Sequence, residues 1–281
     1  APGAALAFHT AFCGLADFAN GIVELATIAG ASVIVDDVGY LTAPMFQDGI
    51  VAQAVDMVVD MGVSYFSSAG NSARESYESV YRNSGIDLGP DGTGDTAFRF
   101  IAHDFDPGPG VDIFQTVTFF GSRLSFQWDD PFFSVSGGAG SATDMDIAIF
   151  DMSGNLINYA FDGNIGGDAV EIISGLGQVQ VAIGKFAGPD PGLIKYIAFD
   201  AGIEVNEYDT ASSTVFGHAN AVGAEAVGAA DYRDTPAFGV NPPVVESFSS
   251  AGGTPILFDT DGNRLATPEI RNAPDIVAPD G

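Results

Sequence analysis

Asn71 is the residue of this chain whose type and setting point most directly to chemistry. It ends the segment Gly62–Asn71 (GVSYFSSAGN), in which a predicted buried strand runs into a turn of small residues. A side-chain amide in this place can donate a hydrogen bond to an oxygen that becomes charged only in a transition state. Gly70 lets the backbone turn closely, because it carries no side chain. The alternative is an asparagine that caps the start of a helix.

Two acidic segments are candidates for metal binding. Asp259, Asp261 and Asn263 alternate around a turn glycine, which brings together the hard oxygen ligands that calcium prefers. The segment lacks the distal glutamate of an EF-hand, and a solvated turn is the alternative. No cysteine–histidine cluster suggests zinc, and no glycine-rich loop precedes a lysine to hold phosphate. Calcium is therefore the one cofactor that the sequence suggests. The second acidic cluster is formed by Asp144, Asp146 and Asp151.

The elements that must position these residues alternate between strands and helices in residues 1–71. Apolar runs predict buried strands at residues 5–8, 32–35 and 63–66. Between them, apolar residues recur at helical spacing in residues 18–28 and 50–61, each stretch with a polar opposite side. Strands that alternate with helices form a parallel sheet with right-handed crossovers.

The character of the sequence changes near residue 84. Residues 83–95 are rich in Gly, Asp and Pro, which is typical of a loop or linker. From residue 96 to about 208, short β-rich runs alternate with turn clusters and the helical period disappears, which predicts an antiparallel β-sandwich. We therefore predict one α/β domain, formed by residues 1–84 and 209–281, that is split by an inserted all-β domain in residues 85–208.

Composition limits the possible partners. The chain of 281 residues has 37 acidic and 9 basic residues, for a formal net charge of −28. This balance argues against nucleic acid and against anionic membrane surfaces. No apolar run approaches the roughly 20 residues of a membrane span. Cys13 is the one cysteine, so no intrachain disulfide can form, and we expect it to be a core residue.

Six short motifs follow one another in a defined order. They are residues 1–8 (APGAALAF), 32–39 (SVIVDDVG), 67–71 (SSAGN), 216–229 (FGHANAVGAEAVGA), 247–252 (SFSSAG) and 273–279 (APDIVAP). In this order, and at this spacing once the insertion is removed, they resemble the catalytic domain of subtilisin-like serine peptidases. The resemblance covers over half of the chain.

The resemblance implies roles for individual residues. Asn71 would belong to the oxyanion hole, and the substrate would lie along Asp37, Val38 and Gly39. The floor of the specificity pocket would be formed by Phe216, Gly217 and His218.

Asp37 and His218 have side chains whose roles are not fixed by the resemblance. The family usually has a small serine where this chain has Asp37. An acid there would favour basic substrates, act protonated at low pH, or be held by a local hydrogen bond. Asp36, one residue away on a strand, should face the opposite side. We expect His218 in the pocket or in packing rather than as a general base, and His9 and His103 to be structural.

The inserted domain bears its own resemblance. Residues 125–131 (SFQWDDP) and 144–151 (DMDIAIFD) look like pre-peptidase C-terminal domains, which are jelly-roll sandwiches attached to secreted bacterial peptidases. The fold implied for the whole chain is α/β, a partial subtilisin-like parallel sheet with helices on both faces, interrupted by the all-β jelly-roll sandwich.

The function implied is that of part of a secreted or cell-surface bacterial serine endopeptidase that acts on a protein or peptide substrate. The catalytic aspartate, the base and the nucleophilic serine would lie outside this sequence, as would any signal peptide. We therefore predict that the chain alone hydrolyses nothing. The alternative is a non-catalytic scaffold of peptidase type that binds protein or carbohydrate.

Overall fold

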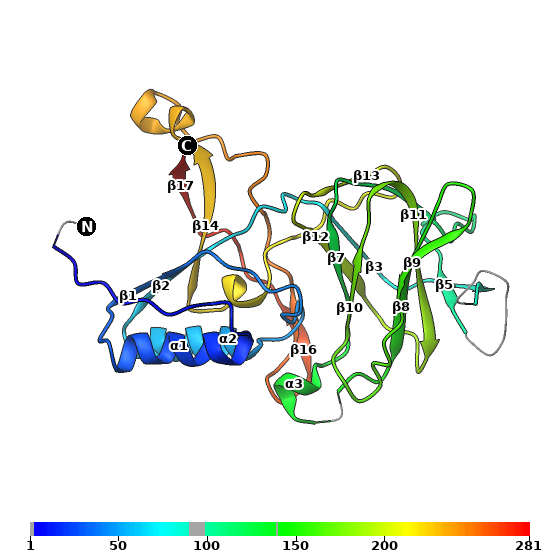
Figure 1. Cartoon of the computed structure of the whole chain (residues 1–281), viewed down its shortest axis with the longest axis horizontal. Helices are drawn as coiled ribbons and strands as arrows, with labels where there is room; N and C mark the ends of the chain where they lie inside the picture. Colours follow the sequence, from blue (N-terminus) through cyan, green and yellow to red (C-terminus); the bar gives the residue numbers. More distant parts are fainter. Residues whose placement is uncertain (1–2, 90–98, 139) are drawn as a thin grey trace. The chain divides into compact units, whose positions relative to one another are not determined.

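The computed structural model describes residues 3–89, 99–138 and 140–281. The chain forms two compact units, which are drawn in Figure 1. Unit 1 comprises Ala1–Ala73, Ser213–Ile256 and Leu265–Gly281, and unit 2 comprises Arg74–Ser212 and Leu257–Arg264.

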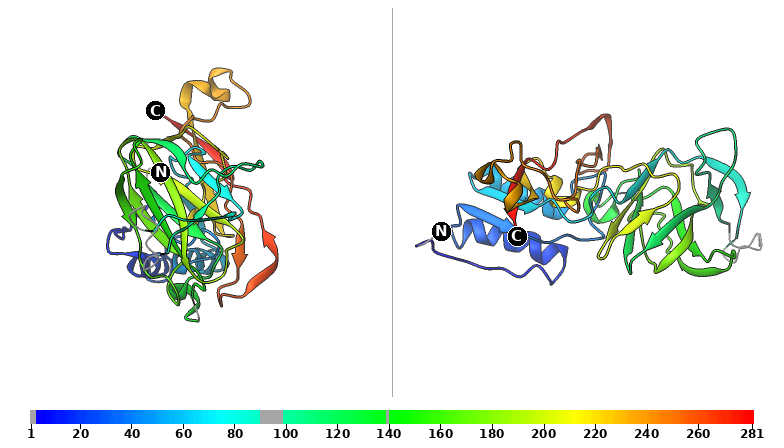
Figure 2. Two further views of the ribbon diagram at one scale, coloured as in Figure 1. Left: turned by 90° about the vertical axis from the view of Figure 1, so that its right-hand side faces the viewer. Right: turned by 90° about the horizontal axis from the view of Figure 1, so that it is seen from above.

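Unit 1 is built on a parallel sheet of four strands in the order β1-β2-β14-β17. The strands are β1 (Val33–Asp36), β2 (Ser64–Ser68), β14 (Ala224–Asp231) and β17 (Ile276–Asp280). Asp36 pairs with Ser67, and Ser68 pairs with Val227, so the carboxyl ends of β1 and β2 lie at one edge of the sheet. Figures 1 and 2 show β14 and β17 side by side.

Two amphipathic helices, α1 (Leu15–Thr27) and α2 (Ile50–Asp60), accompany this sheet. They pack against each other on the same side of β1 and β2, as Figure 1 shows. Their apolar faces form one core with the inward side chains of the sheet. Its buried members include Phe18, Ile22, Ile34, Val51, Val55, Val58 and Tyr65.

The predicted fold class, an α/β fold with helices on both faces of its sheet, is wrong. Over the described residues the α-helices are α1, α2 and the four-residue α3 (Phe133–Ser136), and strands dominate. The outward side chains of β1, Val33 and Val35, are 54% and 71% exposed. The reason is that only two stretches of the sequence carry a helical period long enough to cover a sheet, and both helices pack on one face.

The strand predicted at residues 5–8 is also absent, since these residues form no strand in the structure. Leu6 and Phe8 are 93% and 90% exposed. An apolar run predicts a strand only where a partner strand lies beside it to pair its backbone. Cys13, which was expected in the core, is likewise exposed.

Unit 2 consists of antiparallel strands in two sheets. One sheet has the order β10-β7-β12-β3, and the other has the order β13-β6-β11-β5-β4 with β8 and β9 attached to β11. One core unites inward residues of both sheets, among them Trp128, Tyr196 and Val181. The strands are β3 (Ser76–Ser79), β4 (Asn83–Asp87), β5 (Ile101–His103), β6 (Gln115–Phe119), β7 (Arg123–Trp128), β8 (Asp144–Phe150), β9 (Leu156–Ala160), β10 (Val170–Ser174), β11 (Gly177–Ala187), β12 (Ile194–Phe199) and β13 (Ile203–Val205).

The remaining elements are short. A two-stranded sheet is formed by β15 (Ile256–Phe258) and β16 (Arg264–Glu269). The 3₁₀ turns of the described residues are η1 (Gly217–Asn220), η2 (Tyr232–Asp234) and η3 (Pro236–Phe238). None of the helices in the described part of the chain has the length and apolar character needed to cross a membrane.

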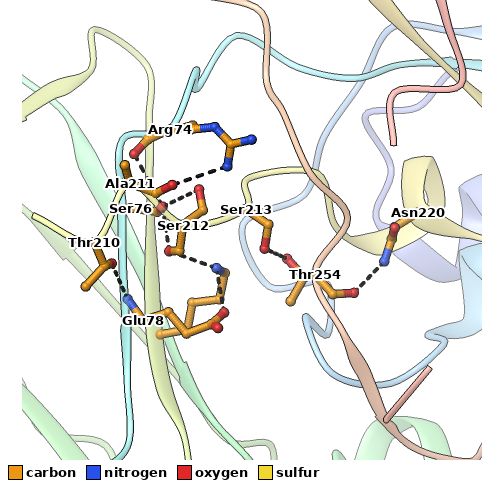
Figure 3. A network of polar contacts seen from close by, with 10 residues as sticks. Arg74, Ser76, Glu78, Thr210, Ala211, Ser212, Ser213, Asn220 and Thr254 are labelled. Atoms are coloured by element: carbon orange, nitrogen blue, oxygen red, sulfur yellow. Dashed lines mark hydrogen bonds and ion pairs between the residues drawn. The ribbon is translucent and has the colours of Figure 1, made fainter. Parts of the chain in front are cut away.

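A buried lysine anchors the sheet β10-β7-β12-β3 of unit 2. The side chain of Lys195, on β12, is completely buried, and its Nζ lies 2.9 Å from Glu78 Oε2 on β3. Nζ also donates to Ser212 Oγ at 3.2 Å, and Ser212 Oγ lies 2.8 Å from Ser76 Oγ. Figure 3 shows this network, in which Arg74 also donates to the carbonyl of Ala211. Burial lowers the pKa of Lys195, and the charge of Glu78 opposes that shift.

We expect Glu78→Gln to lower the free energy of unfolding by about 3 kcal/mol, because the variant leaves a buried ammonium without its counter-ion. Lys195→Met removes the charge itself and should stay close to the wild type. The matched control is Asp200→Asn, since the Arg123–Asp200 pair is 48% and 44% exposed and should contribute less than about 1 kcal/mol. Urea unfolding of the chain measures the free energy of unfolding of all three variants. Equal losses of this free energy in Glu78→Gln and Asp200→Asn would contradict the role of Glu78 as the counter-ion of Lys195.

Candidate functional site

A cleft of about 460 Å³ opens at the carboxyl end of β1. Clefts at the carboxyl ends of parallel strands are the usual binding sites of open sheets. The predicted substrate-lining residues border this cleft, and the carboxylate of Asp37 is exposed there. The lining residues are Ala11, Phe12, Gly14, Asp37, Val38, Gly39 and Tyr40.

Asn71 lies just beyond the carboxyl end of the neighbouring strand β2 and is exposed. The backbone reverses at Gly70, whose φ of 94° lies in the left-handed region that favours glycine. Ser250 fixes this turn, because its amide donates to the Gly70 carbonyl and its hydroxyl accepts from the Ser72 amide, each at 2.9 Å. A turn and then β3 follow Asn71, so the asparagine does not cap a helix.

Asp36 faces the helices and is the centre of a buried polar cluster. Its Oδ1 accepts from Ser67 Oγ at 2.9 Å and lies 3.1 Å from His218 Nε2. The side chains of Asp36 and His218 are only 6% and 4% exposed. Burial alone raises the pKa of Asp36, but the hydrogen bond and the charge of His218 outweigh it and hold this pKa below its usual value.

The predicted pocket residues therefore lie in two different places. His218 is buried under the sheet with its ring against Phe18 and Tyr40, at centroid distances of 5.7 and 6.2 Å. Phe216 and Gly217 are half-buried, and neither borders the cleft beside Asp37. The packing role that the sequence allowed for His218 is the one that its contacts favour.

A half-buried ion pair in unit 1 was not predicted from the sequence. The two terminal nitrogens of Arg271 each lie 2.7 Å from an oxygen of Asp48, and Arg271 also donates to the Asn220 carbonyl at 2.7 Å. The Asn220 amide in turn donates to the carbonyl of Thr254 at 2.8 Å, as Figure 3 shows. The sequence does contain a signal for this pair. Basic residues are few and acidic residues are many, so an arginine is expected to be paired with an acid. A cavity of about 150 Å³ lies beside Arg271.

The predicted calcium residues close a turn instead. Asp259 Oδ1 accepts from the amides of Asp261 and Asn263 at 3.0 and 2.8 Å, and the Asn263 side chain donates to Oδ2 at 3.1 Å. Asp151 makes the same bonds to Ser153 and Asn155 in its own turn. Over the described residues, no group of three or more acidic, histidine or cysteine side chains is arranged to hold a metal ion. Because its carboxylate oxygens already accept hydrogen bonds within the turn, Asp259 as arranged here does not fit a calcium site.

We expect Asp259→Ala to lower the melting temperature by a few degrees, because three hydrogen bonds within the turn are lost. Asp151→Ala should have a similar effect, since the two turns are bonded alike. Adding millimolar calcium or a chelator should leave the melting temperature of the wild type unchanged. A rise with calcium that Asp259→Ala abolishes would restore the metal hypothesis.

Unit 2 contains a second group of buried acids. Asp146 and Glu171 are 5% and 2% exposed, and Asp144 is 7% exposed. Two of these carboxylates accept hydrogen bonds from backbone amides, Glu171 from Asp162 N at 3.0 Å and Asp144 from Asn164 N at 3.2 Å. Burial, followed by the neighbouring carboxylates, raises the pKa of both Asp146 and Glu171 to about 8.

The sequence matches no protein-family model, and it matches no curated protein. The structure is similar to that of the CspB protease of Clostridium perfringens, with a TM-score of 0.45 and 11% identity, covering 94% of this chain and 52% of that one. It is also similar to chitosan-binding module 1 of a chitosanase/glucanase from Paenibacillus sp. IK-5, with a TM-score of 0.20 and 14% identity, covering 47% of this chain and 98% of that one. The chain thus spans about half the length of the protease that it matches. At these TM-scores the similarities establish neither a shared fold nor a shared function.

Proposed function

We propose that this chain is part of a subtilisin-like serine endopeptidase, in which unit 1 supplies the substrate-binding and oxyanion-binding groups. One observation carries the proposal. The cleft-lining residues Asp37–Gly39 and the exposed Asn71 follow the carboxyl ends of β1 and β2, which are neighbouring parallel strands. This is the edge at which an open parallel sheet binds its ligands.

The chemistry of the proposed reaction divides between this chain and residues outside it. A serine oxygen attacks the peptide carbonyl carbon while a general base takes the serine proton, and the amine then leaves with that proton. Water reverses the same steps to release the acid. The amide of Asn71 donates to the carbonyl oxygen as it becomes negatively charged, and Asp37 lies where a basic side chain of the peptide would be attracted.

A second candidate is a binding scaffold without catalysis. The observation that favours it is the lining of the cleft, to which, among the described residues, Asp37 contributes a charged group but no serine, cysteine or histidine contributes. In this alternative, the same cleft binds a peptide or protein segment and no bond is broken.

Hydrolysis of fluorescently labelled casein by the full-length protein, at acid and neutral pH, distinguishes the two functions. The peptidase proposal predicts hydrolysis that a serine-directed inhibitor abolishes, whereas this chain alone should be inactive. If the chain retains the same activity after purification with inhibitor controls, the assignment of the nucleophile to residues outside it is wrong. A folded full-length protein without hydrolysis favours the binding scaffold.

A further inference from the structure

The carboxylate of Asp36 joins three segments of unit 1 at a single oxygen atom. Its Oδ1 accepts from the Val38 amide in the cleft-lining segment at 3.4 Å and from Ser67 Oγ on β2 at 2.9 Å. It also lies 3.1 Å from His218 Nε2 on η1. An ionised carboxylate only accepts hydrogen bonds, so Nε2 carries the hydrogen that completes this contact.

These contacts lie in the core of unit 1, where each is costly to lose. Ser67 is 1% exposed, and the side chains of Asp36 and His218 are almost as deeply buried. The rings of Phe18 and Tyr40 pack around the imidazole and hold it in place. When a buried carboxylate loses one hydrogen-bond donor, no water molecule takes the place of that donor. We therefore expect the segments that the carboxylate joins to move.

A buried polar pair of this kind adds little net stability compared with apolar residues that fill the same space. Its value is geometric, since the hydrogen bonds allow one arrangement and apolar packing allows several. Asp36 immediately precedes the cleft-lining segment, and Ser67 lies four residues before Asn71 on β2. A shift of the carboxylate would therefore move both groups that the proposed reaction needs.

We propose that Asp36 and His218 are positioning residues that hold the cleft-lining segment Asp37–Gly39 in register with β2, the strand that leads to Asn71. The geometric role stands on the contacts above, and its meaning for catalysis rests on the proposed function. His218 sets the place of the Asp36 carboxylate, and the carboxylate in turn sets the place of the Val38 amide.

Hydrogen exchange on this chain tests the pair through His218→Ala and His218→Gln. The glutamine amide can place a donor where Nε2 lies, whereas alanine leaves the carboxylate one donor short. We expect amide exchange over residues 37–40 to rise about tenfold in His218→Ala, the equivalent of about 1.4 kcal/mol. It should return to within about threefold of the wild type in His218→Gln, since that variant keeps a hydrogen bond to a charged group. Exchange in β8 and β11 of unit 2 is the internal control.

The same variants separate this inference from the proposed function. If His218→Ala is folded and exchanges over residues 37–40 like the wild type, or if His218→Gln fails to restore protection, the positioning role is wrong. Should His218→Ala not fold, Ser67→Ala removes a different donor to the same oxygen and must raise exchange at the Val38 amide. An acetylated tetrapeptide ending in arginine amide is titrated in parallel, and failure of the wild type to bind it counts against the proposed function alone.

Discussion

The free energy of unfolding should fall as the pH rises from 5 to 9, because two buried acids of unit 2 hold protons when folded. The pKa values of Asp146 and Glu171 are raised to about 8, whereas such groups in an unfolded chain titrate near pH 4. Between these values the folded state binds more protons than the unfolded state, so stability is lost with rising pH. Each group contributes up to about 1.4 kcal/mol per pH unit in this range.

The variants Asp146→Asn and Glu171→Gln identify the groups responsible. Each replaces a carboxyl group by an amide of the same shape that does not titrate, so the dependence on pH should become shallower. The two acids influence each other, so the observed midpoints belong to the pair rather than to either residue. Asp234→Asn, on the exposed turn η2, is the control and should leave the slope unchanged. A wild-type profile that is flat from pH 5 to 8 would contradict the buried-proton account.

Replacing Asn71 by alanine should lower kcat of the full-length protein by about 10²–10³, since an oxyanion donor acts mainly in the transition state. KM should change little, because the substrate carbonyl is not yet charged in the ground state. Folding should be retained, as the Asn71 side chain is exposed.

The matched control for Asn71→Ala is Asn20→Ala. Asn20 is an exposed asparagine of the same unit on α1, outside the cleft, so its loss should leave both kinetic parameters unchanged. Equal activity of the two variants would remove Asn71 from the oxyanion role.

Local elements with a clear period could be predicted from the sequence. The helical spacing over residues 50–61 corresponds to α2 (Ile50–Asp60), and the run at residues 63–66 corresponds to β2 (Ser64–Ser68). Elements that depend on partners distant in the sequence could not be predicted in this way. β3 (Ser76–Ser79) pairs with β12 in unit 2, although its residues fall within the range predicted for the α/β domain. The face of the sheet on which each helix packs was also not encoded in any local pattern.

In the candidate site, too, local features could be predicted from the sequence and contacts between distant residues could not. Strand alternation predicted that Asp36 and Asp37 face opposite sides, and in the structure the Asp36 side chain is buried whereas Asp37, just beyond β1, is exposed. The partner of Asp36 could not be predicted, since His218 is 182 residues away in the sequence. The turn at Asp259 was interpreted as a metal loop because spacing alone does not reveal that Asn263 already satisfies the carboxylate.

Labelling the full-length protein with a fluorophosphonate probe, and mapping the modified residue by mass spectrometry, tests the proposed serine peptidase most directly. We predict labelling of one serine that lies beyond residue 281, lost on heat denaturation and weakened in Asn71→Ala. A folded protein in which no serine is labelled at acid or neutral pH would contradict the proposal and leave unit 1 as a peptide-binding scaffold.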